Sequence, residues 1–184
     1  MPTLRIVAGK LKGRRIPVPE DPALRPTGDR VREAMFNILG QDLSGFAVLE
    51  LYAGTGALGF EALSRNARRV VFVEANPKLA AGIRGTAEAL GVDREARVVV
   101  GRVEDVLDRR QLGGPFELIV ADPPYDTLDL SGLIARIDES HLLGLHGTLV
   151  IERETRTSPA VGTAGLTLGR TSSYGRASLD FYNY

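Results

Sequence analysis

The sequence predicts an α/β fold in which a mostly parallel sheet is covered by helices. From about residue 47, short runs rich in Val, Ile and Leu alternate with longer segments of helical spacing, as in a sheet buried on both faces. The last two runs alternate in polarity around Gly175, which is typical of an antiparallel hairpin. The 184 residues, 43% of them hydrophobic, suit one domain with a small appendage.

We assign the predicted appendage to residues 1–40 and the main domain to residues 41–184. The run RIVAGKLKGRRIPVP is too short and too rich in glycine for a helix and resembles a small hairpin. A helix is predicted next within the segment RPTGDRVREAMFNIL (25–39), where it begins behind a cap at Thr27 or Asp29. Its apolar face holds Val31, Ala34, Met35, Ile38 and Leu39.

Within the main domain, the apolar runs predict five buried strands, at 47–52, 69–74, 96–101, 116–121 and 147–152. Helices are expected between them, at about 57–66, 77–91, 103–111 and 128–140. Asn76 and Pro77 make a good helix start, because Asn accepts from free N–H groups and Pro lacks the N–H that would be unpaired. The tail, LTLGRTSSY and then RASLDFYNY, forms the expected hairpin.

The composition excludes several classes of protein. There is no Cys, so disulfides, thiolate zinc sites and iron–sulfur clusters are excluded. His141 and His146 are the only histidines, so the chain has few residues for a Ser/His/Asp triad or for a metal-dependent mechanism. No metal site is predicted. The first residues, MPTLRIVAGKLKGRR, lack the apolar run expected of a signal peptide, and nowhere do 18 consecutive apolar residues occur. We therefore expect a soluble, cytoplasmic monomer that does not bind a membrane.

Charge is unevenly distributed, although the net charge is zero. Residues 1–35 hold eight Lys or Arg against four Asp or Glu, and such a cluster attracts phosphates. A polyanion-facing arm is one interpretation, and a solvated hairpin face is the other. The basic residues predicted to meet nucleic acid are Arg5, Lys10, Lys12, Arg14, Arg15, Arg25, Arg30 and Arg32.

The first predicted strand runs into a G-x-G-x-x-G loop, Gly54 to Gly59, ahead of a helix. Glycines let the backbone approach a ligand closely, and Glu74 fits the acidic residue that holds ribose hydroxyls. This pattern predicts a binding site for a ribose-bearing cofactor. The alternative is a tight turn with a purely structural role. Glu50 could orient the amino-acid end of S-adenosylmethionine, whereas a carboxylate there would oppose the pyrophosphate of a dinucleotide. S-adenosylmethionine is therefore the favoured cofactor. The alternative role for Glu50 is structural, as a carboxylate at the end of a strand that pairs with a nearby Arg.

The fourth predicted strand delivers Asp122-Pro123-Pro124-Tyr125 to the carboxyl edge of the sheet, where open α/β folds bind ligands. An exocyclic base amine is a weak nucleophile, because its lone pair is delocalised into the ring. Asp122 and the Pro123 carbonyl would accept from both N–H groups, and the two prolines stiffen that carbonyl. Tyr125 offers a ring on which an extruded base can stack. The motif predicts methyl transfer to a base amine, with a strand-ending turn as the alternative.

The segments RIVAGKLKGRRIPVP, LRPTGDRVREAMFNIL, LELYAGTGALGFEALSR, FVEANP and ADPPY occur in this order over nearly the whole chain. Together they resemble the bacterial small-subunit (16S) ribosomal RNA guanine-N2 methyltransferases of the RsmD type. ADPPY alone is less specific, because D-P-P-Y also occurs in adenine-N6 DNA methyltransferases. The resemblance implies a Rossmann-like S-adenosylmethionine-dependent methyltransferase fold with a seven-stranded sheet, a catalytic domain over 41–184, and ribosomal RNA or the small-subunit ribonucleoprotein as partner.

The resemblance also implies roles for single residues. Arg102 follows the third strand, where the adenine amino group is commonly met, but its side chain has no acceptor. The backbone of Arg102 or Val103, or the side chain of Glu104 or Asp105, would take that role. Arg25 and Thr27 would contact either RNA or cofactor. The implied cofactor set is Glu50, Tyr52, Ala53, Gly54, Thr55, Gly56, Glu74, Ala75, Arg102 and Val103.

Two further functions from other classes stay open. A nicotinamide-dependent dehydrogenase would use the same glycines and Glu74, but it leaves Asp122-Pro123-Pro124-Tyr125 and the basic arm without a role. A non-catalytic RNA-binding protein with a decayed cofactor site is the third possibility. Within the methyltransferases, an adenine-N6 DNA enzyme or another RNA amino-methyltransferase is the alternative.

Overall fold

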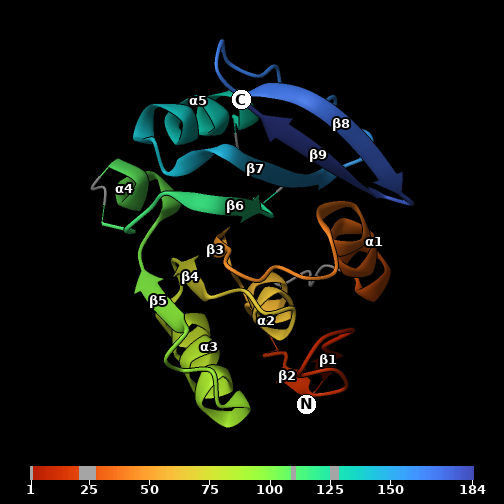
Figure 1. Cartoon of the computed structure of the whole chain (residues 1–184), viewed down its shortest axis with the longest axis vertical. Helices are drawn as coiled ribbons and strands as arrows, with labels where there is room; N and C mark the ends of the chain where they lie inside the picture. The colour runs from red at the N-terminus through yellow and green to blue at the C-terminus, as the bar shows by residue number, and fades with distance from the viewer. Residues whose placement is uncertain (1, 21–27, 109–110, 125–128) are drawn as a thin grey trace.

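A seven-stranded sheet forms the centre of the protein, with strand order β5-β4-β3-β6-β7-β9-β8 (Figure 1). The computed structural model describes residues 2–20, 28–108, 111–124 and 129–184. Five strands run parallel: β3 (Ala47–Leu51), β4 (Arg69–Glu74), β5 (Ala96–Val100), β6 (Phe116–Ala121) and β7 (Leu143–Glu154). The antiparallel strands β9 (Ala177–Asn183) and β8 (Thr167–Tyr174) complete the sheet beside β7. The predicted fold, including the C-terminal hairpin, is confirmed.

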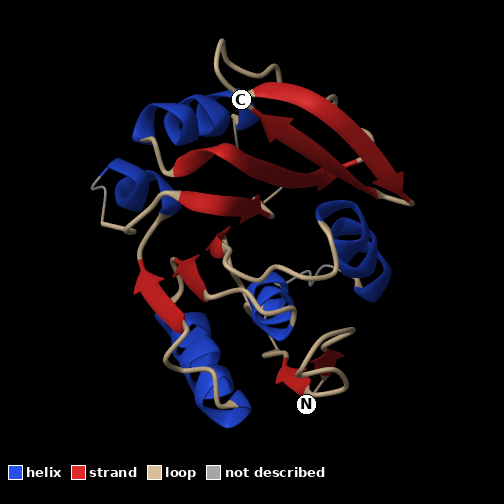
Figure 2. Ribbon diagram, in the orientation of Figure 1, coloured by secondary structure: helices blue, strands red, loops and turns tan. Residues whose placement is uncertain are grey.

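Helices cover both faces of the sheet (Figure 2). One face carries α1 (Asp29–Leu39), α2 (Ala57–Ser64) and α3 (Pro77–Leu90), and the other carries α4 (Val103–Asp108) and α5 (Leu130–Ser140). Successive strand residues alternate between two hydrophobic clusters; Val48, for example, packs on the α2 side and Leu49 on the other. Burial on both faces explains the continuous apolar runs of the sequence.

The predicted cap at Asn76 is confirmed, and the predicted cap of α1 is wrong. The Asn76 side chain accepts from the Lys78 N–H at 2.9 Å, and Pro77 occupies the first position of α3. At α1 the capping position is held by Gly28, and no side chain accepts there. Asp29 lies inside the helix, and its carboxylate instead accepts from Arg32 at 2.9 Å. Thr27 lies outside the described residues.

β7 begins four residues earlier than predicted, at Leu143 rather than at 147. Gly147, at the predicted start of the strand, is required by packing. A Cβ on Gly147 would lie 2.7 Å from a Leu143 methyl carbon and 2.9 Å from the Phe116 carbonyl oxygen. The pairing of β6 with β7 also shifts register between Phe116 and Leu118, so the start of β7 is irregular.

The predicted N-terminal hairpin is present, as β1 (Thr3–Arg5) paired antiparallel with β2 (Arg15–Pro17). Ile6 and Ile16, each 1% exposed, belong to the same hydrophobic cluster as Met35 and Phe60. The core is thus continuous across residue 40. The division of the chain into an arm and a catalytic domain at that point stays a prediction.

The turn of the hairpin is anchored to the C-terminal half of α2. The buried Glu61 carboxylate accepts from the backbone N–H groups of Val7 (2.8 Å) and Ala8 (3.0 Å) and forms an ion pair with Arg65 at 2.9 Å. The Ser64 hydroxyl donates to the Ala8 carbonyl. Gly9 adopts φ +81°, and a Cβ there would lie 1.9 Å from the Ser64 carbonyl oxygen. The arm is therefore joined to the helix that begins at the glycine loop.

Candidate active site

The glycine loop turns the chain from the end of β3 into α2 at the carboxyl edge of the sheet. Tyr52, Gly54 and Gly56 adopt positive φ angles of 56°, 55° and 75°. For Tyr52 this conformation is unfavourable, and such residues are concentrated at ligand sites and switches. The Ala53 N–H donates to the Val73 carbonyl at 3.0 Å, which fixes the loop against the end of β4.

Gly59, in the first turns of α2, lies where no side chain fits. A Cβ there would lie 2.3 Å from the Phe72 ring and 2.6 Å from a Glu50 carboxylate oxygen. Gly56 is tight as well, with Phe60 and Phe72 ring atoms 3.0 Å from a built Cβ. The spacing of the predicted motif therefore has a structural cause, since Gly59 lets α2 pack closely on β3 and β4.

Glu50 is buried beneath the start of α2. Its carboxylate accepts from the Gly59 N–H at 2.8 Å and from the Leu58 N–H at 3.3 Å. Burial raises the pKa of Glu50 to about 8; the two N–H donors oppose this shift, and the negative charges of Asp122 and Glu74 add to it. Glu50 thus holds the helix start in place, and the prediction that it also contacts the cofactor stays a prediction.

Glu74 joins the glycine loop to the end of β4. One oxygen of its carboxylate accepts from the Gly54 N–H at 2.7 Å, and the other accepts from the Asn76 N–H at 2.8 Å. A carboxylate has about four acceptor positions, so both oxygens can still accept from a ligand hydroxyl. Ala75 is exposed beside it. This geometry suits the ribose contact of Glu74, which stays a prediction.

Four neighbouring strands carry a carboxylate at the carboxyl edge on the same face of the sheet, and we call these residues the acidic row: Glu74, Glu50, Asp122 and Glu152. The residues two positions before them, all in the cluster on the α1–α3 side, are Phe72, Val48, Val120 and Val150. Asp122 is half-buried directly after β6, and Pro123 is buried. Tyr125 lies outside the described residues. No metal-binding group of His or carboxylate side chains forms within the described part of the chain.

The segment after β5 places Glu104, rather than Arg102, towards the glycine loop. The Tyr52 hydroxyl donates to Glu104 Oε1 at 3.2 Å, and Arg136 donates to the Glu104 carbonyl. Burial, followed by the neighbouring Glu104 carboxylate, raises the pKa of Tyr52 well above its usual range, so the hydroxyl stays neutral. Arg102 is 74% exposed and lies 3.4 Å from Glu104 Oε2. Val103 is buried and Asp105 is exposed.

The basic residues predicted to meet RNA fall into two groups. The exposed ones are Arg5, Lys10, Lys12, Arg14, Arg15 and Arg30. Arg32 is only 1% exposed, and its guanidinium donates to the Arg5 carbonyl at 2.8 Å, so it supports the arm from inside and leaves the RNA-facing set. Arg25 lies outside the described residues.

Comparison with known proteins places this geometry in a family. The family model described as "Conserved hypothetical protein 95" matches residues 4–183. Ribosomal RNA small subunit methyltransferase D of Haemophilus influenzae is 32% identical over 180 residues, covering 97% of this chain and 93% of the relative. The chain belongs to this family. The resemblance inferred from the sequence motifs is therefore confirmed.

Solved structures agree with the assignment to the methyltransferase D family. The structure of Escherichia coli yhhF superposes with a TM-score of 0.87 at 31% identity, covering 98% of this chain and 97% of that one. An RNA methyltransferase from Salinibacter ruber in complex with S-adenosylhomocysteine has a TM-score of 0.63 at 17% identity, covering 85% and 92% of the two chains. The second match shows the shared fold alone.

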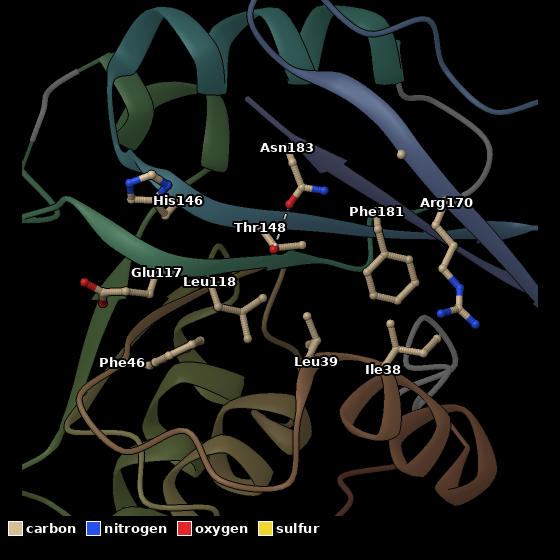
Figure 3. A pocket seen from close by; sticks show the side chains of 11 residues that line it. Ile38, Leu39, Phe46, Glu117, Leu118, His146, Thr148, Arg170, Phe181 and Asn183 are labelled. Carbon is tan, nitrogen blue, oxygen red and sulfur yellow. Dashed lines mark hydrogen bonds between the residues drawn. The ribbon is translucent and has the colours of Figure 1, made fainter.

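A separate pocket of about 360 Å³ lies beside α1 in this family member (Figure 3). Phe46, Leu118 and Phe181 form much of its apolar wall, and Thr148 donates to Asn183 at 2.9 Å above them. Among the predicted site residues that the structure describes, none lines it. The pocket is thus distinct from the glycine loop and Asp122.

Sequence reasoning missed two sets of residues. Glu61, Ser64 and Arg65 anchor the arm, and the only signal was three polar residues at helical spacing in an apolar helix. Glu152 was missed because a Glu that ends an apolar strand resembles a solvent-exposed residue, yet it is 4% exposed. Across the described ranges, no helix is long and apolar enough to cross a bilayer.

Proposed function

We propose that this protein transfers a methyl group from S-adenosylmethionine to the exocyclic N2 amine of a guanine in small-subunit ribosomal RNA. One observation carries the proposal: Asp122 and Pro123 follow β6 directly beside β3, whose end forms the glycine loop, on the face that bears Glu50 and Glu74. The name of the Haemophilus influenzae relative supports ribosomal RNA as substrate. A location in the cytoplasm, a monomeric state, and ribosomal RNA or the small-subunit ribonucleoprotein as partner stay predictions.

The charge of the site supports S-adenosylmethionine over a dinucleotide. Glu50, Glu74 and Asp122 lie next to the loop at the ends of three neighbouring strands, and their carboxyl groups favour the ammonium and sulfonium groups of the cofactor and disfavour a pyrophosphate. Gly54 and Gly56 would lie against the methionine part, and Glu74 would accept from the ribose hydroxyls. Glu104 is the better placed acidic candidate for the adenine amino group, because Tyr52 orients its carboxylate while Asp105 faces solvent.

The chemistry requires positioning more than acid or base catalysis. When bound, the cofactor supplies an electrophilic methyl group on a sulfonium. The Asp122 carboxylate and the Pro123 carbonyl accept from the two N–H bonds of the target amine and direct its lone pair at that methyl. The nitrogen becomes cationic as the new bond forms, and Asp122 stabilises that charge. The proton is lost to water afterwards.

Two experiments separate this proposal from the alternatives. S-adenosylhomocysteine, and not a nicotinamide cofactor, is expected to raise the melting temperature; the opposite result would favour a dehydrogenase. Mass spectrometry of small-subunit RNA, from cells with and without the gene, should reveal one N2-methylguanine that depends on the gene. Methylation of adenine, or a missing methyl group on DNA, would replace the proposal with an alternative.

Cofactor affinity is expected to depend on pH through Glu50. The free protein holds Glu50 protonated up to about pH 8, and a bound ammonium group favours the carboxylate, so binding releases a proton. As the pH rises towards 8, the Kd for S-adenosylhomocysteine should therefore fall by up to about tenfold per pH unit. Above pH 8 the Kd should level off. Calorimetry in buffers of different ionisation enthalpy measures the proton release. In Glu50→Gln the Glu50 contribution should vanish, and an unchanged pH profile would contradict this assignment.

The arm is expected to provide salt-dependent affinity for RNA. Lys10 and Lys12 are exposed in the turn of the hairpin, and each phosphate that the protein no longer neutralises should lower the slope of log Kd against log salt by about 1. Lys10→Ala with Lys12→Ala is compared with Arg68→Ala with Arg97→Ala, which removes equal charge at the amino ends of β4 and β5. Equal slopes for the two variants in filter-binding titrations would refute the arm's role.

A further inference from the structure

Glu152 is the member of the acidic row to which the proposed function gives no role of its own. Ala121 of β6 pairs with Ile151 of β7, so Asp122 and Glu152 are the next residues on adjacent parallel strands, which lie about 4.8 Å apart. Glu152 pairs with Leu179 and follows Val150 by two positions, and both of these lie in the cluster on the α1–α3 side. Its side chain therefore shares a face with Asp122.

The strand order places Glu152 on the substrate side of Asp122. β3 and β4, which carry the glycine loop, Glu50 and Glu74, lie on one side of β6, and β7 lies on the other. A base whose amine is held at Asp122 has the cofactor towards β3, so its remaining edge extends over β7. Glu152 is 4% exposed at that position, which means that water competes little for its carboxylate.

The chemistry of the bases decides what a carboxylate recognises there. Guanine carries a ring N–H, at N1, on one side of its amine and a bare nitrogen, N3, on the other side. Adenine and cytosine carry a bare ring nitrogen next to theirs, which is an acceptor and is repelled by a carboxylate. A buried acceptor beside the amine site therefore accepts guanine and rejects the other two bases, because a mismatch leaves two acceptors facing each other. Glu152 also has an interaction within the protein, and its carboxylate has acceptor positions for more than one donor.

We propose that Glu152 selects guanine by accepting the N1–H of the target base while Asp122 and Pro123 hold its N2 amine. This inference rests on the proposed function, since it assigns the base specificity of the same site. Glu152 is thus a specificity residue that touches the base and takes no part in the methyl transfer itself.

The test uses RNA in which the mapped guanine is replaced by 2-aminopurine, which keeps the amine and lacks the N1–H. The wild-type protein should methylate the guanine RNA with a kcat/KM about 100-fold or more above that of the 2-aminopurine RNA. In Glu152→Gln the preference should fall to about tenfold or less, because the amide can turn its NH₂ towards the bare N1. Glu154→Gln is the matched control, since Glu154 lies two residues further along the same face, partly exposed and 3.6 Å from Arg156.

Each outcome has a separate meaning. An unchanged preference in Glu152→Gln, with both rates lowered together, would make Glu152 a structural residue and overturn the inference. Equal methylation of the two RNAs by the wild-type protein would also overturn it, and that comparison needs no folded variant. If the wild-type protein methylates no guanine N2 at all, the proposed function fails instead. S-adenosylhomocysteine affinity should be unchanged in Glu152→Gln, which checks that the cofactor side is intact.

Discussion

Asp122→Ala is expected to lower the rate of methyl transfer by about 100-fold to 1,000-fold or more, with little change in cofactor affinity. Removing one preorganised group that stabilises a developing charge has an effect of this size. Asp122 is half-buried after the end of β6, so its removal leaves the strand pairing in place. It also contributes to the raised pKa of Glu50, so without it Glu50 should ionise more easily and still bind the cofactor.

Single-turnover transfer of a labelled methyl group to small-subunit RNA measures the chemical step, and calorimetry with S-adenosylhomocysteine measures binding. Asp122→Asn keeps the shape and one acceptor oxygen, so its rate should lie between those of wild type and Asp122→Ala. Asp93→Ala, an exposed carboxylate in the loop after α3, is the control and should behave as wild type. Full activity in Asp122→Ala would remove Asp122 from the mechanism. A loss of cofactor binding would make it a cofactor residue instead.

The parallel part of the fold could be predicted because burial on both faces leaves an unmistakable pattern. RVVFVE at 69–74 and FELIVA at 116–121 match β4 and β6 at both ends. The start of β7 could not be predicted, because Gly147 is required by contacts with Phe116 and Leu143 that the sequence does not reveal. The cap of α1 was missed for a similar reason: the Asp29 carboxylate is occupied by Arg32.

The candidate site shows the same division. Motif spacing was enough to bring Gly54, Glu74 and Asp122 to one edge, because the carboxyl ends of parallel strands share an edge. The direction of single side chains was not predictable. The sequence assigned Arg32 to the surface, whereas tertiary packing buries it against the arm. Glu152 belongs to the site only because β7 pairs with β6, a long-range relation that no local pattern records.

Gly59→Ala is expected to lower the free energy of unfolding by about 1–3 kcal/mol or more and to weaken S-adenosylhomocysteine binding at least tenfold. The added Cβ would lie 2.3 Å from the buried Phe72 ring and 2.6 Å from the Glu50 carboxylate. Glu50 is held by the N–H groups of Leu58 and Gly59, so it cannot move aside without releasing the start of α2. The loop that meets the cofactor would shift with it.

Urea denaturation should show that Gly59→Ala and Gly85→Ala change the free energy of unfolding in opposite directions. Gly85 lies within α3 with nothing near a built Cβ, so alanine there should stabilise the protein by about 0.4–1 kcal/mol. Phe72→Leu should relieve Gly59→Ala, because it removes the ring atom that the new Cβ meets. The double variant should then be more stable than the sum of the two single changes predicts. Additive effects would mean that the contact with Phe72 is not what makes Gly59 necessary, which would leave the contact with Glu50 as the cause.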